Sequence, residues 1–183
     1  MEMNTLLKLP ADINRSRGLI LVLTEDKARA GITELIANLI LNGPLFVVSA
    51  SEWLPAYELT RTLRKNTLAI KETLDHLFTV RASTCYRLLD SLANIPSNGE
   101  PILVIDFLHT FYDADIPLRV RLYKLRECCR QLKRLALYRP VVVMTQVVQT
   151  EEYKKFFPAL GSVADKIFTL ENELEQITQP VLF

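Results

Sequence analysis

The sequence predicts one α/β domain built on a doubly wound, mostly parallel β-sheet. Short apolar runs, rich in Val, Ile and Leu and bounded by Pro, Gly or polar residues, recur along the chain. Such runs are typical of strands buried on both faces, as in a parallel sheet. Helical stretches lie between them, which favours helices packed on the two faces of the sheet. The 183 residues and the 49% hydrophobic content suit a single domain with a stable core.

Six runs are predicted to be strands. Four of them are continuously apolar, whereas the last one alternates and is typical of a late edge strand. The run that begins at His76 is a further, more polar candidate. The predicted strands cover residues 18–24, 44–49, 76–81, 101–107, 140–146 and 166–170.

Four intervening stretches are predicted to be helices, over residues 33–41, 54–74, 83–95 and 118–137. Ser83 is placed to cap the third helix. Trp53 and Tyr57, four residues apart near the start of the second, are expected to pack in the core or in an interface. The last helix is the clearest, because its apolar residues recur at spacings of four and three along one side. These residues are Leu118, Leu122, Leu125, Cys129, Leu132 and Ala136.

The composition excludes several classes of protein. Five scattered glycines exclude a glycine-rich phosphate cradle, and two separate histidines do not suit a histidine-based metal site. The three cysteines, Cys85, Cys128 and Cys129, fit neither a disulfide framework nor a zinc site and are expected in a reduced interior. No apolar run is long enough to span a membrane, and no signal peptide is evident, so we expect a soluble intracellular protein.

The segment after the first strand lies where a phosphate-binding loop, GxxxxGK[ST], would lie. Aligned on that pattern, Asp26 replaces the first glycine and Ile32 replaces the lysine. An acid repels a phosphate at a helix N-terminus, and an apolar side chain cannot neutralise one. The residues that remain for weak phosphate contact are Lys27, Arg29, Gly31 and Thr33.

Asp106 ends the fourth predicted strand. Four apolar residues followed by an aspartate at a strand end form the pattern that holds a magnesium ion in P-loop enzymes. Ligands bind beyond the carboxyl ends of parallel strands, so Asp106 is the candidate metal ligand if a nucleotide binds.

The order of these motifs resembles the RecA-like recombinase family, in its eukaryotic and archaeal branch and the shortened paralogues of that branch. The resemblance spans residues 18–171, as a RecA-like core between an extension of residues 1–17 and a tail of residues 172–183. Residues 102–106 are similar to the family's magnesium strand, and residues 141–147 are similar to the next strand, whose polar end senses the nucleotide. The other similar segments are residues 79–89, 121–135 and 161–170.

The resemblance implies a P-loop NTPase core with a degenerate phosphate loop. The family's catalytic glutamate falls on Ala50, although a shift of two residues brings Glu52 there. With the lysine replaced and the base in question, the resemblance implies a pseudo-ATPase that binds no nucleotide cofactor or binds ATP and magnesium only weakly. Such a subunit is expected to assist DNA repair or homologous recombination, together with another RecA-like chain or a recombinase.

Two alternatives remain open. In the first, the protein is a divergent ATPase that binds ATP and magnesium: Lys27 or Arg29 replaces the lysine, Asp106 holds the metal, and Glu52 or Gln146 lies near the attacking water. In the second, it is a RecA-like structural or signalling subunit that makes no contact with DNA.

One segment of the chain is strongly basic, although the net charge of the whole chain is only +1. Residues 117–139 carry eight Lys or Arg residues against one acid, Glu127. The cations largely avoid the apolar side of the helix, so they can form a surface for nucleic-acid phosphates. The alternative is a solvated helix whose charges pair with acidic neighbours. The basic residues on the helix are Arg119, Arg121, Lys124, Arg126, Arg130, Lys133 and Arg134, and Arg139 follows it.

Two loops correspond in position to the family's DNA-facing loops. The first, residues 109–117, is acidic. The second, residues 148–160, places Lys154, Lys155 and Phe156 together, and cations beside aromatic rings can hold single-stranded DNA by charge and stacking. The alternative is that Phe156 and Phe157 pack in the core or in an interface.

Overall fold

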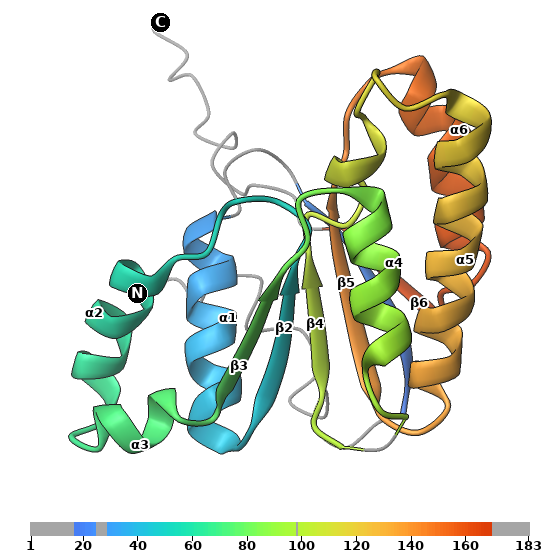
Figure 1. Ribbon diagram of the computed structural model, residues 1–183. Coiled ribbons are helices and arrows are strands. Elements are labelled where there is room, and N and C mark those ends of the chain that lie inside the picture. The colour runs from blue at the N-terminus through green and yellow to red at the C-terminus, as the bar shows by residue number, and fades with distance from the viewer. Residues whose placement is uncertain (1–16, 25–28, 98, 170–183) are drawn as a thin grey trace, which may run out of the picture.

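The computed structural model describes residues 17–24, 29–97 and 99–169. These residues form one sheet of six parallel strands in the order β3-β2-β4-β5-β1-β6 (Figure 1). The predicted parallel α/β fold is therefore confirmed, and the last strand lies at an edge as expected. The strands are β1 (Gly18–Thr24), β2 (Leu45–Ser49), β3 (Leu77–Arg81), β4 (Ile102–Ile105), β5 (Pro140–Gln146) and β6 (Lys166–Thr169).

Helices cover both faces of the sheet (Figure 1). Helices α1, α2 and α3 lie on one face, and α4, α5 and α6 lie on the other. No helix in the described part of the chain is both long enough and apolar enough to cross a bilayer. The helices are α1 (Arg29–Asn42), α2 (Ala56–Asn66), α3 (Ile70–Leu74), α4 (Cys85–Asn94), α5 (Leu118–Ala136) and α6 (Glu151–Gly161), and a short 3₁₀ helix spans His109–Phe111.

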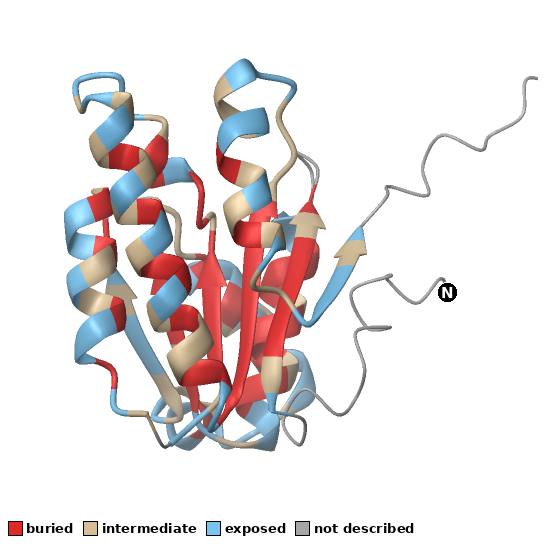
Figure 2. Ribbon diagram, turned by 90° about the vertical axis from the view of Figure 1, so that its right-hand side faces the viewer, coloured by how far each residue is buried: buried red, intermediate tan, exposed pale blue. Residues whose placement is uncertain are grey.

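Alternate residues of the central strands contribute to two separate hydrophobic cores, one on each face of the sheet. Leu19 and Leu21 point to the side of α4, α5 and α6, whereas Ile20 and Val22 point to the side of α1 and α2. Figure 2 looks onto the layer of α4, α5 and α6, with the buried central strands behind it. Burial on both faces explains why these strands are continuously apolar rather than alternating.

Three expected helix boundaries are wrong. The stretch 54–74 is two helices, because Thr67 has extended backbone angles (φ −149°, ψ 150°) that end α2 before α3 begins. Helix α1 begins at Arg29 rather than at residue 33. Thr84, not Ser83, caps α4: its hydroxyl accepts a hydrogen bond from the Arg87 amide at 3.2 Å.

The three cysteines behave as expected. Cys85, Cys128 and Cys129 are free and buried. Burial raises the pKa of all three thiols, that of Cys129 to about 12. Among the described residues, no group of three or more His, Cys, Asp or Glu side chains is arranged to hold a metal ion. The thiols are therefore neutral packing groups on the α5 side of the sheet.

Asp165 ties the edge strand β6 to β1. Its carboxylate accepts a hydrogen bond from the Leu19 amide at 2.7 Å, and the Lys133 ammonium lies 2.6 Å from its other oxygen. The Leu19 amide first and Lys133 second lower the pKa of Asp165. The folded protein therefore favours the charged carboxylate more than the unfolded chain does.

We expect Asp165→Asn to destabilise the protein by about 1 kcal/mol at pH 7, since the pair is partly exposed and screened by solvent. Because the folded pKa is lowered, the charged carboxylate stabilises the protein above its unfolded pKa of about 3.9. That contribution is lost as the pH falls through the lower folded pKa. Urea midpoints at pH 7 and at pH 3 measure this, and the variant's deficit should shrink at acid pH. An equal deficit at both values would contradict the assignment.

Candidate functional site at the strand ends

A pocket of about 610 Å³ opens at the carboxyl ends of the four central strands. Strands β1 and β5 are neighbours in the sheet, but α1 and α6, which follow them, pack on opposite faces. Diverging connections of this kind leave a crevice at the strand ends, where α/β proteins bind ligands. The loops after β1, β2, β4 and β5 all contribute to the pocket wall.

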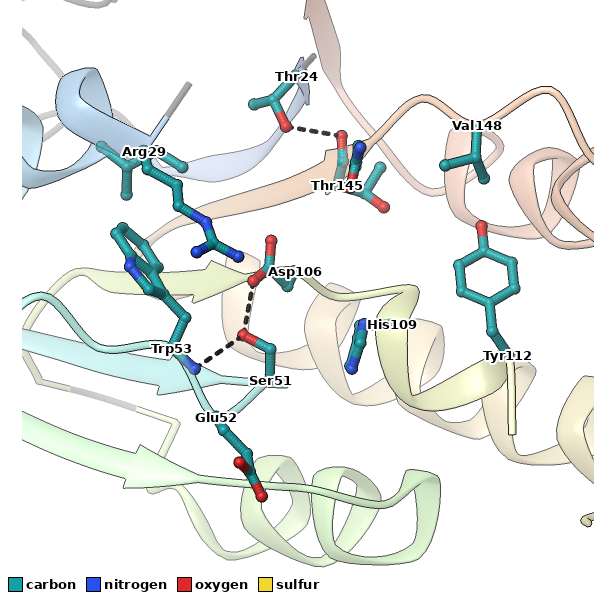
Figure 3. A pocket seen from close by; sticks show the side chains of 12 residues that line it. Thr24, Arg29, Ser51, Glu52, Trp53, Asp106, His109, Tyr112, Thr145 and Val148 are labelled. Atoms are coloured by element: carbon teal, nitrogen blue, oxygen red, sulfur yellow. Dashed lines mark hydrogen bonds between the residues drawn. The ribbon is translucent and has the colours of Figure 1, made fainter. Parts of the chain in front are cut away.

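Asp106 lies in the middle of the pocket, directly after β4 (Figure 3). Its backbone has a positive φ of 55°, a left-handed conformation that Asp and Asn tolerate better than most residues. The Ser51 hydroxyl donates a hydrogen bond to its carboxylate at 2.6 Å and accepts one from the Trp53 amide at 3.3 Å. The loop after β2 thus fixes the orientation of the carboxylate.

Among the described residues of the expected phosphate loop, Thr24, Arg29 and Ile32 line the pocket. Ile32, which takes the place of the lysine, lines the pocket wall. Thr33 is buried and its hydroxyl bonds to the Arg29 carbonyl oxygen at 3.0 Å, inside the helix. Gly31 is also buried in α1. Lys27, together with the acid at position 26, lies outside the described residues.

Arg29 supplies a positive charge to the pocket. Its guanidinium carbon lies 5.5 Å from the centre of the Trp53 ring, a cation–π distance. Figure 3 shows the guanidinium between Trp53 and Asp106. The Arg29 guanidinium and the Asp106 carboxylate therefore both lie in the pocket, with the hydroxyls of Ser51, Thr24 and Thr145 also lining it.

The two candidates for activating a water differ in their placement. Glu52 is exposed at the pocket rim, and Figure 3 shows its carboxylate turned away from Asp106. Ala50, the other position compatible with the family's glutamate, is fully buried. Gln146, at the end of β5, lines the pocket. The structure thus brings Gln146 and Asp106 into one pocket and leaves Glu52 at its edge.

Four cations of the basic segment are engaged inside the molecule. Arg121 is buried and donates to the Phe111 carbonyl at 2.9 Å and to Glu152 at 2.8 Å. Lys133 pairs with Asp165. Arg134 and Arg139 donate to backbone carbonyls in and around residues 92–100. The expected phosphate contact is wrong for Arg121, because a buried guanidinium cannot reach a phosphate outside the protein.

The remaining cations of α5 face solvent. Arg119 and Arg126 are exposed. Arg130 is also exposed and forms an ion pair with Glu127 at 3.0 Å. The Lys124 ammonium lies 4.9 Å from the centre of the Tyr86 ring on α4. These four residues stay candidates for a phosphate-binding surface.

The second loop region is the helix α6. Phe156 is fully buried against Phe111 and Tyr112, so the expectation that its ring stacks on DNA is wrong. The alternative, core packing, is confirmed for Phe156. Lys154 is exposed but pairs with Glu151 at 2.6 Å, and Lys155 is exposed. In this region the Phe156 ring therefore lies in the core, whereas the two lysines lie at the surface.

Several pocket residues were missed in the sequence. Ser51 and Thr145 come from the ends of β2 and β5, and a search of every strand end for hydroxyls would have found them. His109 and Tyr112 follow β4 on a short 3₁₀ turn, for which the sequence gives no periodic signal. Burial raises the pKa of Tyr112 to about 12, with smaller effects from Tyr153 and Glu152, so this phenol stays protonated.

Trp53 and Tyr57 have separate environments. Trp53 packs against the core on the α1 side and lines the pocket, as its large apolar ring suggests. Tyr57 is 76% exposed on α2, so core packing is wrong for this residue.

No family model and no curated protein matches the chain.

Proposed function

We propose that the protein is a RecA-like pseudo-ATPase, a non-catalytic subunit that assists DNA repair or recombination. It does so by binding another RecA-like chain or a recombinase, and single-stranded DNA. The observation that carries this proposal is the pocket at the strand ends. It keeps a carboxylate at Asp106 but has the apolar side chain of Ile32 where a phosphate-binding loop has its lysine.

The described pocket residues do not fit magnesium triphosphate. A phosphate cradle needs backbone amides at a glycine-rich turn, a lysine on the terminal phosphates and a hydroxyl on the metal. Here the matching hydroxyl, on Thr33, is bonded to the Arg29 carbonyl, and no lysine is among the described residues that line the pocket. Asp106 also lines the pocket, and its carboxylate accepts a hydrogen bond from the Ser51 hydroxyl.

The divergent ATPase is the second candidate, and one observation favours it. Arg29 places a guanidinium in the pocket, beside Asp106. A guanidinium can neutralise phosphate charge in place of lysine. The two proposals therefore differ in whether Arg29 and Asp106 act on a bound nucleotide.

Thermal unfolding with and without magnesium and ATP separates the two candidates. A ligand at 100-fold excess over its Kd stabilises a protein by about 2.7 kcal/mol. For a chain of this length, that raises Tm by about 5–10 °C. We expect no such rise, because the described residues that line the pocket include no lysine and no free threonine hydroxyl at the position that the phosphate loop uses.

Two variants identify the source of any rise that does occur. Asp106→Asn keeps a residue that tolerates the left-handed backbone, and Arg29→Ala removes the guanidinium. Asp113→Asn, in the exposed loop before α5, is the control for a lost charge. A magnesium-dependent rise that disappears in both pocket variants and persists in the control would replace our proposal by the ATPase.

The partner role has its own test. The full chain, purified under mild conditions from its native source, is expected to bring down a RecA-like subunit or a recombinase. A set of unrelated assembly proteins in its place would contradict the proposal and favour a structural subunit.

A further inference from the structure

We infer that the outer face of α5 is the surface that binds single-stranded nucleic acid, through a stripe formed by Arg119, Tyr123, Arg126 and Arg130. This inference rests on the nucleic-acid role in the proposed function and assigns that role to one surface. The stripe lies on a helix that packs against a face of the sheet (Figures 1 and 2), and none of its four residues lines the strand-end pocket.

The four side chains share one side of the helix. Their spacings of four, three and four residues follow the helical repeat, so they lie above one another on successive turns. With a rise of 1.5 Å per residue, Arg119 and Arg130 are about 16 Å apart along the axis. The residues buried against the sheet, such as Leu125, Cys128 and Leu132, lie on other sides of α5. The stripe is therefore open to a partner along three turns.

Its charges are available for binding. Arg119 and Arg126 are exposed and form no ion pair or hydrogen bond with any other residue in the part of the chain that the structure describes. Arg130, whose side chain is 73% exposed, pairs with Glu127. The Glu127 side chain is only 19% exposed, but its Arg130 partner is open to solvent, so we expect a phosphate to compete with the carboxylate for Arg130. Glu127 is the only acid on α5.

Tyr123 favours single-stranded nucleic acid over an acidic protein as the partner of the stripe. It lies between Arg119 and Arg126 on the stripe, and it is 59% exposed. A second exposed ring, Tyr86, lies beside the helix under the Lys124 ammonium. An acidic protein needs only the cations, whereas unpaired bases also stack on aromatic rings. Arginines bind phosphates with two parallel hydrogen bonds, and three of the four residues are arginines.

The test is the binding of a fluorescently labelled oligothymidylate, followed by anisotropy at low salt. The stripe variant Arg119→Ala/Arg126→Ala/Arg130→Ala is expected to bind at least about tenfold more weakly. The matched control is Arg61→Ala/Arg64→Ala/Lys65→Ala on α2, which removes the same charge from another exposed surface. It should change the affinity by no more than about twofold. All six side chains are exposed, so both variants should keep the native Tm.

The salt dependence and the tyrosine give two further readouts. Each lost phosphate contact reduces the slope of log K against log salt by about 0.7 for a single strand, so three contacts reduce it by about 2. Tyr123→Ala is expected to weaken binding by about tenfold without changing that slope, because it removes stacking and no charge. Tyr123→Phe, which keeps the ring, should bind like the unaltered protein.

Three results would overturn the inference. Equal losses in the stripe and control variants would mean that net charge alone attracts the strand. An affinity that does not depend on salt concentration, or an absence of binding at low salt, would exclude nucleic-acid phosphates as the ligand of the stripe. Loss of a co-purifying protein in the stripe variant, with no oligonucleotide binding by the unaltered chain, would assign the stripe to a protein partner. None of these results depends on the magnesium–ATP test. Stabilisation by nucleotide would contradict the proposal of a pseudo-ATPase but would leave the inference about the stripe unaffected.

Discussion

Phe156→Ala is expected to destabilise the protein by about 3–5 kcal/mol, the usual cost of removing a large buried ring. The ring is fully buried, with its centre 6.2 Å from that of Phe111 and 5.8 Å from that of Tyr112. The Arg121 guanidinium carbon lies 5.8 Å from the same ring. The substitution therefore leaves a cavity between α6 and the turn after β4 and removes a partner of a buried cation.

Urea unfolding followed by circular dichroism measures this effect. Phe157→Ala is the matched control, because Phe157 is only partly buried and stacks on Tyr153 at 5.4 Å. We expect it to cost about 1–1.5 kcal/mol, as for a partly exposed aromatic pair. If Phe156→Ala kept its stability and instead lost affinity for oligonucleotides, the burial of this ring would be refuted.

Arg134→Ala is expected to destabilise the protein by about 2–3 kcal/mol, because charged donors to buried carbonyls are strong and costly to remove. One Arg134 nitrogen donates to the carbonyls of Leu92 and Ile95 at 3.0 and 3.1 Å, and another donates to the Ser97 hydroxyl at 2.8 Å. Leu92 and Ile95 lie in the last turn and at the C-terminal cap of α4. Arg134 thus satisfies helix-end carbonyls that have no partner within the helix.

Two variants make this measurement specific. Arg134→Lys keeps the charge but cannot place donors on three acceptors at once, so it should recover less than half of the loss. Arg126→Ala, on the exposed face of the same helix, should leave the free energy of unfolding within about 0.5 kcal/mol of the native value. If the Arg134→Ala variant were as stable as the unaltered protein but bound oligonucleotides more weakly, the structural role would be contradicted. Arg134 would then be assigned to the nucleic-acid-binding surface.

Burial on two faces made most of the sheet predictable. The strand at residues 140–146 was predicted with the bounds that the structure gives, because both of its faces are buried and its first five residues are apolar. The break between α2 and α3 could not be predicted in the same way. Residues 66–69 contain no proline or glycine, and the turn there depends on how both helices pack against α1 and against each other.

The candidate site was predicted only in part. Asp106 was found because strand ends are visible in the sequence. Its bond to Ser51 depends on β2 and β4 being neighbours, and the sheet does not follow the order of the chain. The burial of Arg121 had a signal that was missed: residue 121 lies four before Leu125, on the side of the helix that continues to Cys128 and Leu132. Charge alone gave no indication of which cations face inward.

The sheet order also determines when the chain can begin to fold. Strand β1 pairs only with β5 and β6, and Gly18 is aligned with Pro140, which follows it by 122 residues. During synthesis, the first strand therefore leaves the ribosome with no partner. Strand β2 pairs with both β3 and β4, so these three strands can assemble first. Closing so long a loop is slow and leaves an apolar strand exposed meanwhile, so this protein should need a chaperone more than its modest length suggests.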